Sequence, residues 1–283
     1  MTWNVEEIKT KLSELSSPNP EIEAIIKMMD DGISDLGIIG KKVLADPVLA
    51  ARILQLANSS FYGFTKEVKD VDMACVILGA NTIRNLIYTL VVLSRFNGPR
   101  QDTQLDYTQI WRHSLMTACI SQELSRRQNI DFLTAFTAGL FNNLGVVLMD
   151  YFYGEEITEC VRVARQEKKH LVSSERSILG KDHRTLSAIV LECWSFPQDI
   201  VQVLNSGSEI NSPMALAVSL GDVLATSIVG NCIAGVQLHC IAPCKVEASG
   251  VDISDIPAMT LNGLKLFKEL ASEFIPKGKK NGS

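Results

Sequence analysis

Polar residues embedded in apolar stretches mark the positions of this chain that could carry chemistry. They are His113, Asn142, Asn143 and Asp222. An imidazole and a carboxylate commonly ligate divalent metals, whereas a carboxamide is neutral and a weak ligand. If the fold brings them together, His113 and Asp222 supply only one neutral ring and one negative charge against a divalent cation, so we expect no bound metal and no cofactor.

The same residues have a second interpretation as a structural cluster. Asp222 is an isolated acid in the apolar run VSLGDVLA, and a buried carboxylate needs hydrogen-bonding partners. His113, Asn142 and Asn143 could provide them, since amides donate hydrogen bonds to a carboxylate. We therefore expect a hydrogen-bonded cluster that holds helices in register, with a small-molecule pocket at the same place as the alternative.

Several separated motifs occur along the chain. In order they read SELSSPNPEIEAI, VLADPVLAARILQLANSSFYG, VDMACVILGANTIRNLI, AGLFNNLGVV and SILGKDHRTLSAIVLECWSFPQDI. In this order they resemble the HDOD family, the HD-related output domain of bacterial signalling proteins. The resemblance runs from about residue 12 to about residue 209, with a fainter extension through Asp222.

The resemblance implies a role for each residue of the polar cluster. HD phosphohydrolases hold metal through a His-Asp pair, and Asn142 and Asn143 stand where that pair would fall. His113 matches the first ligand position and Asp222 the last acidic one. Family members often carry a His pair after the segment matching FPQDIVQVL, whereas this chain reads NSGSE at residues 205–209. HDOD proteins are regarded as non-catalytic relatives, so the resemblance implies relic metal-site positions and no catalytic residue.

Other sites of known chemistry find little support. The sequence contains no G-x-S-x-G, H-E-x-x-H or G-x-G-x-x-G motif. His239, Cys240 and Cys244 lack a second Cys/His pair at zinc-site spacing. His170 and His183 lie in polar surroundings, and we expect them to be surface or capping residues.

The composition indicates a globular chain without a cluster of basic residues. The 283 residues are 46% hydrophobic, which is enough to bury a sizeable core. The net charge is −5 and the basic residues are scattered, which argues against nucleic acid as a partner. The seven cysteines lie mostly in apolar helical patterns, as expected for free thiols in a reducing compartment.

No segment predicts export or a membrane span. The N-terminus MTWNVEEIKTKL has acidic residues and no apolar signal-peptide core. Residues 223–244 contain no Asp, Glu, Lys or Arg, but they are rich in small polar residues, so we expect a buried helix followed by a turn. These features predict a cytoplasmic protein without a membrane partner.

Hydrophobic periodicity predicts the fold class. Apolar residues recur with a period near 3.6 through almost the whole chain, whereas β-branched alternation between tight turns is nearly absent. The pattern predicts an all-α protein. The polar segment 96–106 is expected to join two closely packed helical lobes, residues 1–103 and an HD-related bundle at 104–283.

Local capping residues predict where some helices begin and end. Asp46 before Pro47 has the pattern of an N-cap followed by proline in the first turn. Asp182 can open a helix over residues 183–194 in the same way. Gly79 and Gly180 are expected at stops or turns.

The segment NSSFYG at the end of an expected helix is part of a candidate interaction surface. We assign Asn58, Phe61, Tyr62 and Arg84 to it. The alternative is a structural turn with both aromatic rings in the core, since aromatic side chains bury large apolar areas.

These features favour a non-catalytic regulatory module that acts through protein partners in a signalling pathway. The alternatives are a metal-dependent phosphohydrolase of the HD superfamily and a small-molecule sensor that uses the relic metal pocket. The sequence leaves the oligomeric state open.

Overall fold

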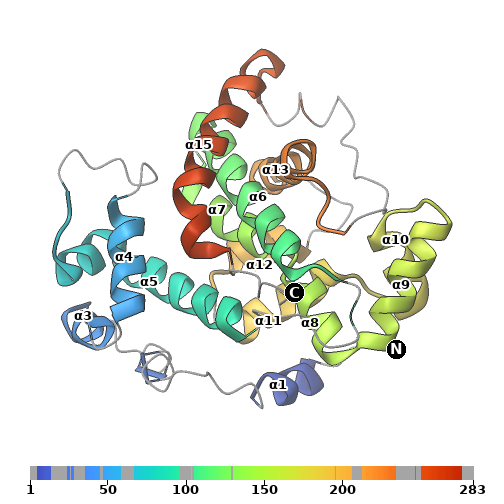
Figure 1. Cartoon of the computed structure of the whole chain (residues 1–283), viewed down its shortest axis with the longest axis horizontal. Coiled ribbons are helices and arrows are strands. Elements are labelled where there is room, and N and C mark those ends of the chain that lie inside the picture. The colour runs from blue at the N-terminus through green and yellow to red at the C-terminus, as the bar shows by residue number, and fades with distance from the viewer. Residues whose placement is uncertain are drawn as a thin grey trace, which may run out of the picture. The chain divides into compact units, whose positions relative to one another are not determined.

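The computed structural model shows a chain built from helices (Figure 1). Within the described residues no strand occurs, which confirms the all-α fold class. The structure describes residues 5–13, 24–25, 27–28, 36–44, 47–58, 67–95, 103, 105–128, 130–194, 196–205, 212–233, 246 and 250–275.

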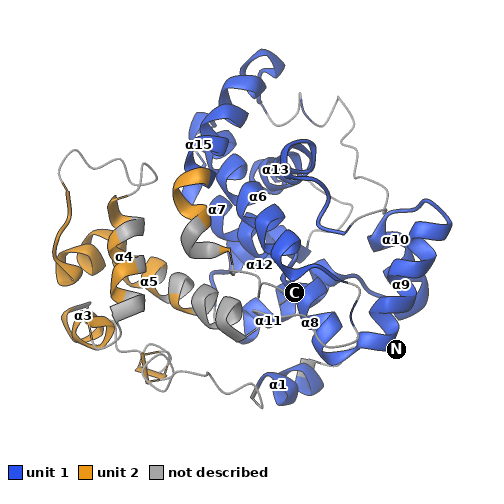
Figure 2. Cartoon of the chain, viewed as in Figure 1, with its two compact units in different colours: residues 1–14, 98–267, 277–283 blue, residues 15–97, 268–276 orange. Residues whose placement is uncertain are grey.

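Two compact units divide the chain (Figure 2). Unit 1 consists of residues 1–14, 98–267 and 277–283, and unit 2 consists of residues 15–97 and 268–276. The two lobes at 1–103 and 104–283, and their close packing, stay predictions.

Among its described residues, unit 2 has helices α3 (Leu36–Leu44), α4 (Pro47–Asn58) and α5 (Val71–Arg95), which pack on one another. The start of α4 at Pro47 is confirmed, whereas Asp46 lies outside the described residues. The chain bends inside α5 at Gly79, whose φ of 78° and ψ of 157° are not helical, so the predicted break is present. The buried core of this unit includes Ile39, Val43, Ile53, Ala57, Ala74 and Leu78.

Unit 1 is organised around the long helix α6 (Tyr107–Arg127). It packs on α7 (Phe132–Phe141) and on α13 (Pro213–Val229). Asp106 caps α6, since its side chain accepts a hydrogen bond from the Gln109 amide at 3.0 Å. The buried residues of α6 include the apolar Trp111 and Leu115 and also the polar His113. A helix that buries polar as well as apolar side chains belongs to the core, so α6 is a core helix.

Gly221 lets α13 approach α6 closely. A Cβ atom at this position would stand 3.0 Å from the Thr117 carbonyl oxygen and would overlap Ser121 Oγ. Glycine has no Cβ, so the two helices meet there without a clash. This approach brings the next residue, Asp222, close to α6.

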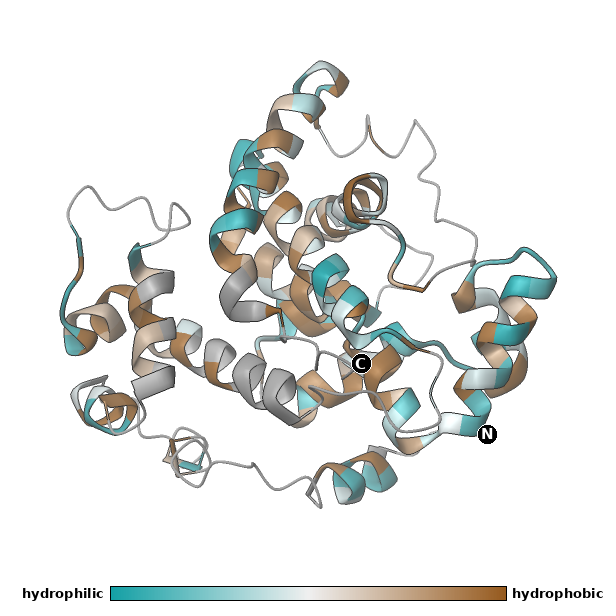
Figure 3. Ribbon diagram, in the orientation of Figure 1, coloured by the Kyte–Doolittle hydropathy of each residue, from teal (hydrophilic) through white to brown (hydrophobic). Residues whose placement is uncertain are grey.

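The helices that follow α7 pack on one another in pairs. α8 (Leu144–Phe152) packs on α9 (Gly154–Gln166) and on α11 (His183–Cys193), α9 packs on α10 (Leu171–Leu179), and α11 packs on α12 (Gln198–Asn205). α9 is amphipathic, as the alternating colours of Figure 3 show: Ile157 and Cys160 are buried, whereas the ion pair of Arg162 with Glu159 is exposed. The predicted burial of the cysteines is confirmed for Cys75, Cys119 and Cys160, whereas Cys193 and Cys232 are half-buried and the other two lie outside the described residues.

Two of the predicted caps are confirmed at the turn between α10 and α11. Gly180 ends α10 in the left-handed conformation, with φ of 76°. Asp182 opens α11, because its carboxylate accepts hydrogen bonds from the backbone amides of Arg184 and Thr185, both at 3.1 Å. This turn places the first residues of α11 beside α10.

The chain ends contribute further helices. α1 (Val5–Ser13) belongs to unit 1 and packs on α11, and its Glu7 carboxylate accepts a hydrogen bond at 3.0 Å from the hydroxyl of Tyr153, which lies between α8 and α9. Burial, together with this hydrogen bond, raises the pKa of Tyr153 to about 12. The short 3-10 helix η1 (Ile253–Asp255) leads into α15 (Ile256–Phe274), the last helix of the described chain.

One apolar stretch of the described chain, Phe132–Phe152, could cross a membrane by length and composition. Its mean hydropathy is 1.6, and 83% of the tested window is buried. It comprises α7 and α8, which a turn at Asn142 and Asn143 separates. It therefore forms part of the core of unit 1. Of residues 223–244, predicted as a buried helix followed by a turn, residues 223–229 form the mostly half-buried end of α13, which stops at Gly230 with φ of 84°, and residues 234–244 lie outside the described residues.

Candidate functional site

Asp222 collects hydrogen bonds from two of the residues predicted to surround it. His113 Nε2 lies 3.0 Å from Asp222 Oδ1, and Asn142 Nδ2 donates to the same oxygen at 3.0 Å. His113 comes from α6, Asn142 from the end of α7 and Asp222 from α13, and all three are buried. The structure therefore brings these residues together as a hydrogen-bonded cluster.

Asn143 has other partners. Its Nδ2 donates to Ser114 Oγ at 3.3 Å, and its Oδ1 lies 3.6 Å from the Cys232 thiol, which donates to it. The expectation that amides donate to the carboxylate therefore holds for Asn142 and is wrong for Asn143. Asn143 instead links α6, the start of α8 and the segment after α13.

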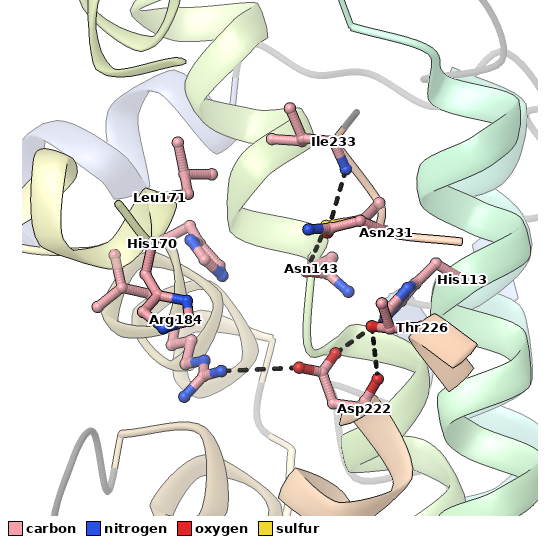
Figure 4. Close-up of a pocket in the computed structure, with 12 residues that line it drawn as sticks. His113, Asn143, His170, Leu171, Arg184, Asp222, Thr226, Asn231 and Ile233 are labelled. Atoms are coloured by element: carbon pink, nitrogen blue, oxygen red, sulfur yellow. Dashed lines mark hydrogen bonds and ion pairs between the residues drawn. The ribbon is translucent and has the colours of Figure 1, made fainter. Parts of the chain in front are cut away.

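A cavity of about 40 Å³ lies beside Asp222. Figure 4 shows Arg184 reaching toward Asp222, with His170 and Leu171 on the same side and His113 on the other. The volume exceeds the minimum of about 10–15 Å³ that one water needs. It is far below the roughly 300–1,000 Å³ of pockets that hold drug-sized ligands. The cavity suits a few water-sized atoms or one small ion.

His183 and Glu175 form a buried pair at the cavity that the sequence reading missed. His183 Nδ1 lies 2.7 Å from Glu175 Oε2, and the His183 backbone amide donates to the same oxygen at 3.1 Å. Both side chains are buried, and His183 lines the cavity. The prediction that His183 is a surface or capping residue is therefore wrong, because its ring is enclosed by the α10–α11 turn. His170 is the half-buried N-cap residue of α10 and also lines the cavity.

A sequence signal for the buried pair exists in its spacing. Glu175 and His183 are eight residues apart, with the helix-ending Gly180 and the cap residue Asp182 between them. An acid and a histidine on either side of a tight turn between helices are placed to meet. Arg184 gives no such signal, since its acidic neighbour Asp222 comes from a remote helix.

Burial dominates the electrostatics of the site. It lowers the pKa of His113, and the neighbouring Asp222 carboxylate opposes this effect only in part. We assign the ring proton to Nε2, because its 3.0 Å contact is with a carboxylate, whereas Nδ1 lies 3.3 Å from the Gly230 carbonyl oxygen. Burial, with Asp222 nearby, raises the pKa of Cys232 to about 12, so this thiol stays protonated at neutral pH.

The residues present do not fit the metal centre that an HD-type site would hold. Asp222 Oδ1 already accepts two hydrogen bonds, and Arg184 Nη2 stands 3.9 Å from Oδ2. This guanidinium would repel a divalent cation at the carboxylate. Within the ranges that the structure describes, no three His, Cys, Asp or Glu side chains gather where they could hold a metal ion.

The candidate interaction surface is described only in part. Asn58 Oδ1 accepts from the Val68 amide and Asn58 Nδ2 donates to the Val68 carbonyl, both at 2.7 Å. Asn58 therefore has a structural role, closing the connection before α5. Phe61 and Tyr62 lie outside the described residues, as does the side chain of Arg84 on α5, so their place on an interaction surface stays a prediction.

Solved structures share this fold. A candidate phosphohydrolase from Shewanella amazonensis SB2B has a TM-score of 0.65 and 22% identity, over 93% of this chain and 97% of that chain. An HDOD domain protein of unknown function from Geobacter sulfurreducens has a TM-score of 0.60 and 19% identity, over 96% of each chain. A candidate signal transduction protein from Marinobacter aquaeolei VT8 has a TM-score of 0.63 and 20% identity, over 96% of this chain and 61% of that chain. No curated protein matches the chain.

The fold and the polar cluster define an HD-related helical protein. The HDOD domain matches residues 15–209, which is more than half of the chain. The chain therefore belongs to the HDOD family. The match includes His113, Asn142 and Asn143, whereas Asp222 lies beyond it.

Proposed function

We propose that this protein is a non-catalytic regulatory module that acts through contacts with protein partners in a bacterial signalling pathway. The proposal places it in the cytoplasm. Membership of the HDOD family supports a regulatory module related to the HD domain. The similar protein from Marinobacter aquaeolei, a candidate signal transduction protein, also supports a regulatory role.

The surroundings of Asp222 are the observation that carries the non-catalytic part. In a catalytic HD site, metal would polarise the phosphate and generate hydroxide near neutral pH. Here Asp222 is hydrogen-bonded to His113 and Asn142, and Arg184 brings a positive charge to its other oxygen. These contacts favour a role for the cluster in holding α6, α7 and α13 together.

Metal content and hydrolase activity test this part directly. Purified protein is expected to hold less than about one tenth of an equivalent of transition metal. It is expected to hydrolyse neither nucleotides nor phosphodiesters above background, even with added manganese. Stoichiometric metal, together with turnover that His113→Ala abolishes, would replace this proposal with the phosphohydrolase alternative.

A variant that restores the metal ligands of an HD site tests whether these positions are a relic metal site. Asn142→His and Asn143→Asp return the missing pair, and Arg184→Ala removes the competing charge. We expect the triple variant to bind manganese while the native protein does not, because the donors are then an imidazole pair and a carboxylate pair. A folded triple variant that binds no manganese would show that these positions are not a relic metal site.

The aromatic residues of NSSFYG test the protein-contact part. A partner captured from the native organism is expected to lose binding when Phe61→Ser and Tyr62→Ser are combined, with thermal stability nearly unchanged. If both rings belong to the core, stability instead falls by several kcal/mol and the surface assignment is wrong.

A further inference from the structure

Arg184 carries an enclosed charge with few partners. Its side chain is 13% exposed, and its Nε atom is buried without a hydrogen-bond partner. Among the described residues, its ion pair with Asp222 is loose, since 3.9 Å exceeds hydrogen-bond length. A guanidinium has five N–H donors, and buried donors are normally satisfied. The Nη groups of Arg184, rather than the inaccessible Nε, are therefore the donors available to the cavity that Arg184 lines.

The start of α10 supplies further donors to the same cavity. Leu171 and Val172 line the cavity, and His170, the residue before them, makes no side-chain cap hydrogen bond. The first amides of a helix have no partner within the helix, and the helix dipole favours an anion there. The positive end of the α10 dipole and the Arg184 charge therefore both lie at the border of this cavity.

His183 offers a second polar atom at the cavity. The residue is only 6% exposed, and its Nδ1 is held by Glu175. Its Nε2 has no hydrogen-bond partner in the part of the chain that the structure describes, and His183 lines the cavity. A ring nitrogen that borders the cavity can hydrogen-bond to a polar group bound there.

We propose that this cavity binds hydrogen phosphate, with Arg184 as the main ligand. A guanidinium matches phosphate through paired N–H donors. The volume of about 40 Å³ suits one small tetrahedral oxyanion. The Arg184 charge disfavours a cation at the same place. This site goes beyond the proposed function, since it needs neither metal nor turnover.

Asp222 gives the proposed site a means of selecting a protonated anion. Its Oδ1 accepts from His113 and Asn142, whereas its Oδ2 faces Arg184 beyond hydrogen-bond length. Hydrogen phosphate keeps an O–H near neutral pH and can donate it to Oδ2. Sulfate would bring an unprotonated oxygen against the carboxylate, and such repulsion lowers affinity.

Calorimetric titration of the full chain tests the proposal, with inorganic phosphate and sulfate compared at constant ionic strength set by chloride. We expect one phosphate per chain and sulfate binding at least about tenfold weaker. Arg184→Gln should weaken phosphate binding at least about tenfold. Arg162→Gln removes the same charge from the exposed face of α9 and should leave binding unchanged. The proposal would be overturned if the native chain bound no phosphate or bound sulfate as tightly as phosphate. It would also be overturned if Arg184→Gln and Arg162→Gln changed phosphate affinity equally.

Two further measurements separate lost binding from lost folding. Phosphate is expected to shift the amide resonances of Leu171 and Val172 in the native chain and in Arg162→Gln, but not in Arg184→Gln. Arg184→Lys keeps the charge without the paired donors, so it should keep the helical circular dichroism spectrum and bind phosphate with intermediate affinity. A folded Arg184→Lys or Arg184→Gln with native phosphate affinity would exclude the guanidinium as the ligand.

Discussion

His113 Nε2 and Asp222 Oδ1 meet at 3.0 Å although 109 positions separate the two residues in the sequence. The contact is one of several that connect α6 to the C-terminal half of α13 and the residue that follows it. His113 Nδ1 lies 3.3 Å from the Gly230 carbonyl oxygen, and Gln109 Nε2 donates to the Val229 carbonyl at 2.7 Å. The polar cluster therefore acts first as a connection between two core helices.

Removing the Asp222 carboxylate is expected to destabilise the protein. Asp222→Ala deletes the acceptor for His113 and Asn142 and leaves both donors buried, so unfolding should become easier by about 2–4 kcal/mol. The midpoint of urea unfolding measures the change. Glu192→Ala, on an exposed position of α11, is the control and should stay within about 0.5 kcal/mol of the native value. Equal midpoints for the two variants would refute a structural role for the cluster.

The lowered pKa of His113 predicts a pH dependence of stability. The unfolded chain binds a proton near the ordinary value of 6.5, whereas burial disfavours that proton in the folded chain. Stability from this group is therefore present above 6.5 and is lost as the pH falls toward the lower folded value. Urea midpoints between about pH 7.5 and pH 5.5 should decrease, and His113→Gln should reduce that decrease. If the urea midpoint instead increased as the pH fell over this range, the folded protein would hold a charged His113 imidazole paired with Asp222.

Features that depend on neighbouring residues in the sequence were predicted well. The helix start at Pro47 and the caps at Gly180 and Asp182 follow from local backbone preferences that tertiary packing rarely reverses. The need of Asp222 for hydrogen-bond donors could also be anticipated, because it is an isolated acid in an apolar run, and the resemblance to HD-type sites indicated His113 and Asn142 as partners.

Features that depend on how helices pair were missed. His183 was predicted at the surface because its neighbours in the sequence are polar, yet the turn between α10 and α11 encloses it beside Glu175. Arg184 reaches Asp222 only because α11 and α13 border the same cavity. Asn143 bonds to Ser114 instead of Asp222, since it begins α8 rather than ending α7. No periodicity in a single helix contains such information.

Gly145 is expected to tolerate no side chain. Its amide donates to Ser187 Oγ at 2.7 Å, and a Cβ atom would overlap the His183 carbonyl oxygen and lie 3.0 Å from His183 Cα. Backbone atoms cannot move aside as a flexible side chain can, so Gly145→Ala should destabilise the protein by about 1–3 kcal/mol. Ser177→Ala, at an exposed position of α10, is the control and should stay within about 0.5 kcal/mol of the native value. Thermal unfolding of both variants gives the comparison, and a neutral Gly145→Ala would contradict the close approach of α8 and α11.

Cys232 is expected to react slowly with alkylating agents in the folded protein. The residue is half-buried, but its Sγ contacts side-chain oxygens of Asn143 and Asn231 at 3.6 and 3.4 Å. Burial, with Asp222 nearby, raises the pKa of the thiol to about 12, and the thiolate is the reactive species. Iodoacetamide at about pH 8 should therefore label Cys232 far faster in urea than in buffer, as measured by peptide mass spectrometry. Asp222→Asn removes the neighbouring negative charge and should speed labelling of the folded chain, because the thiol pKa then falls. Rapid labelling of the native protein would mean that the cavity beside Asp222 opens on the timescale of the reaction.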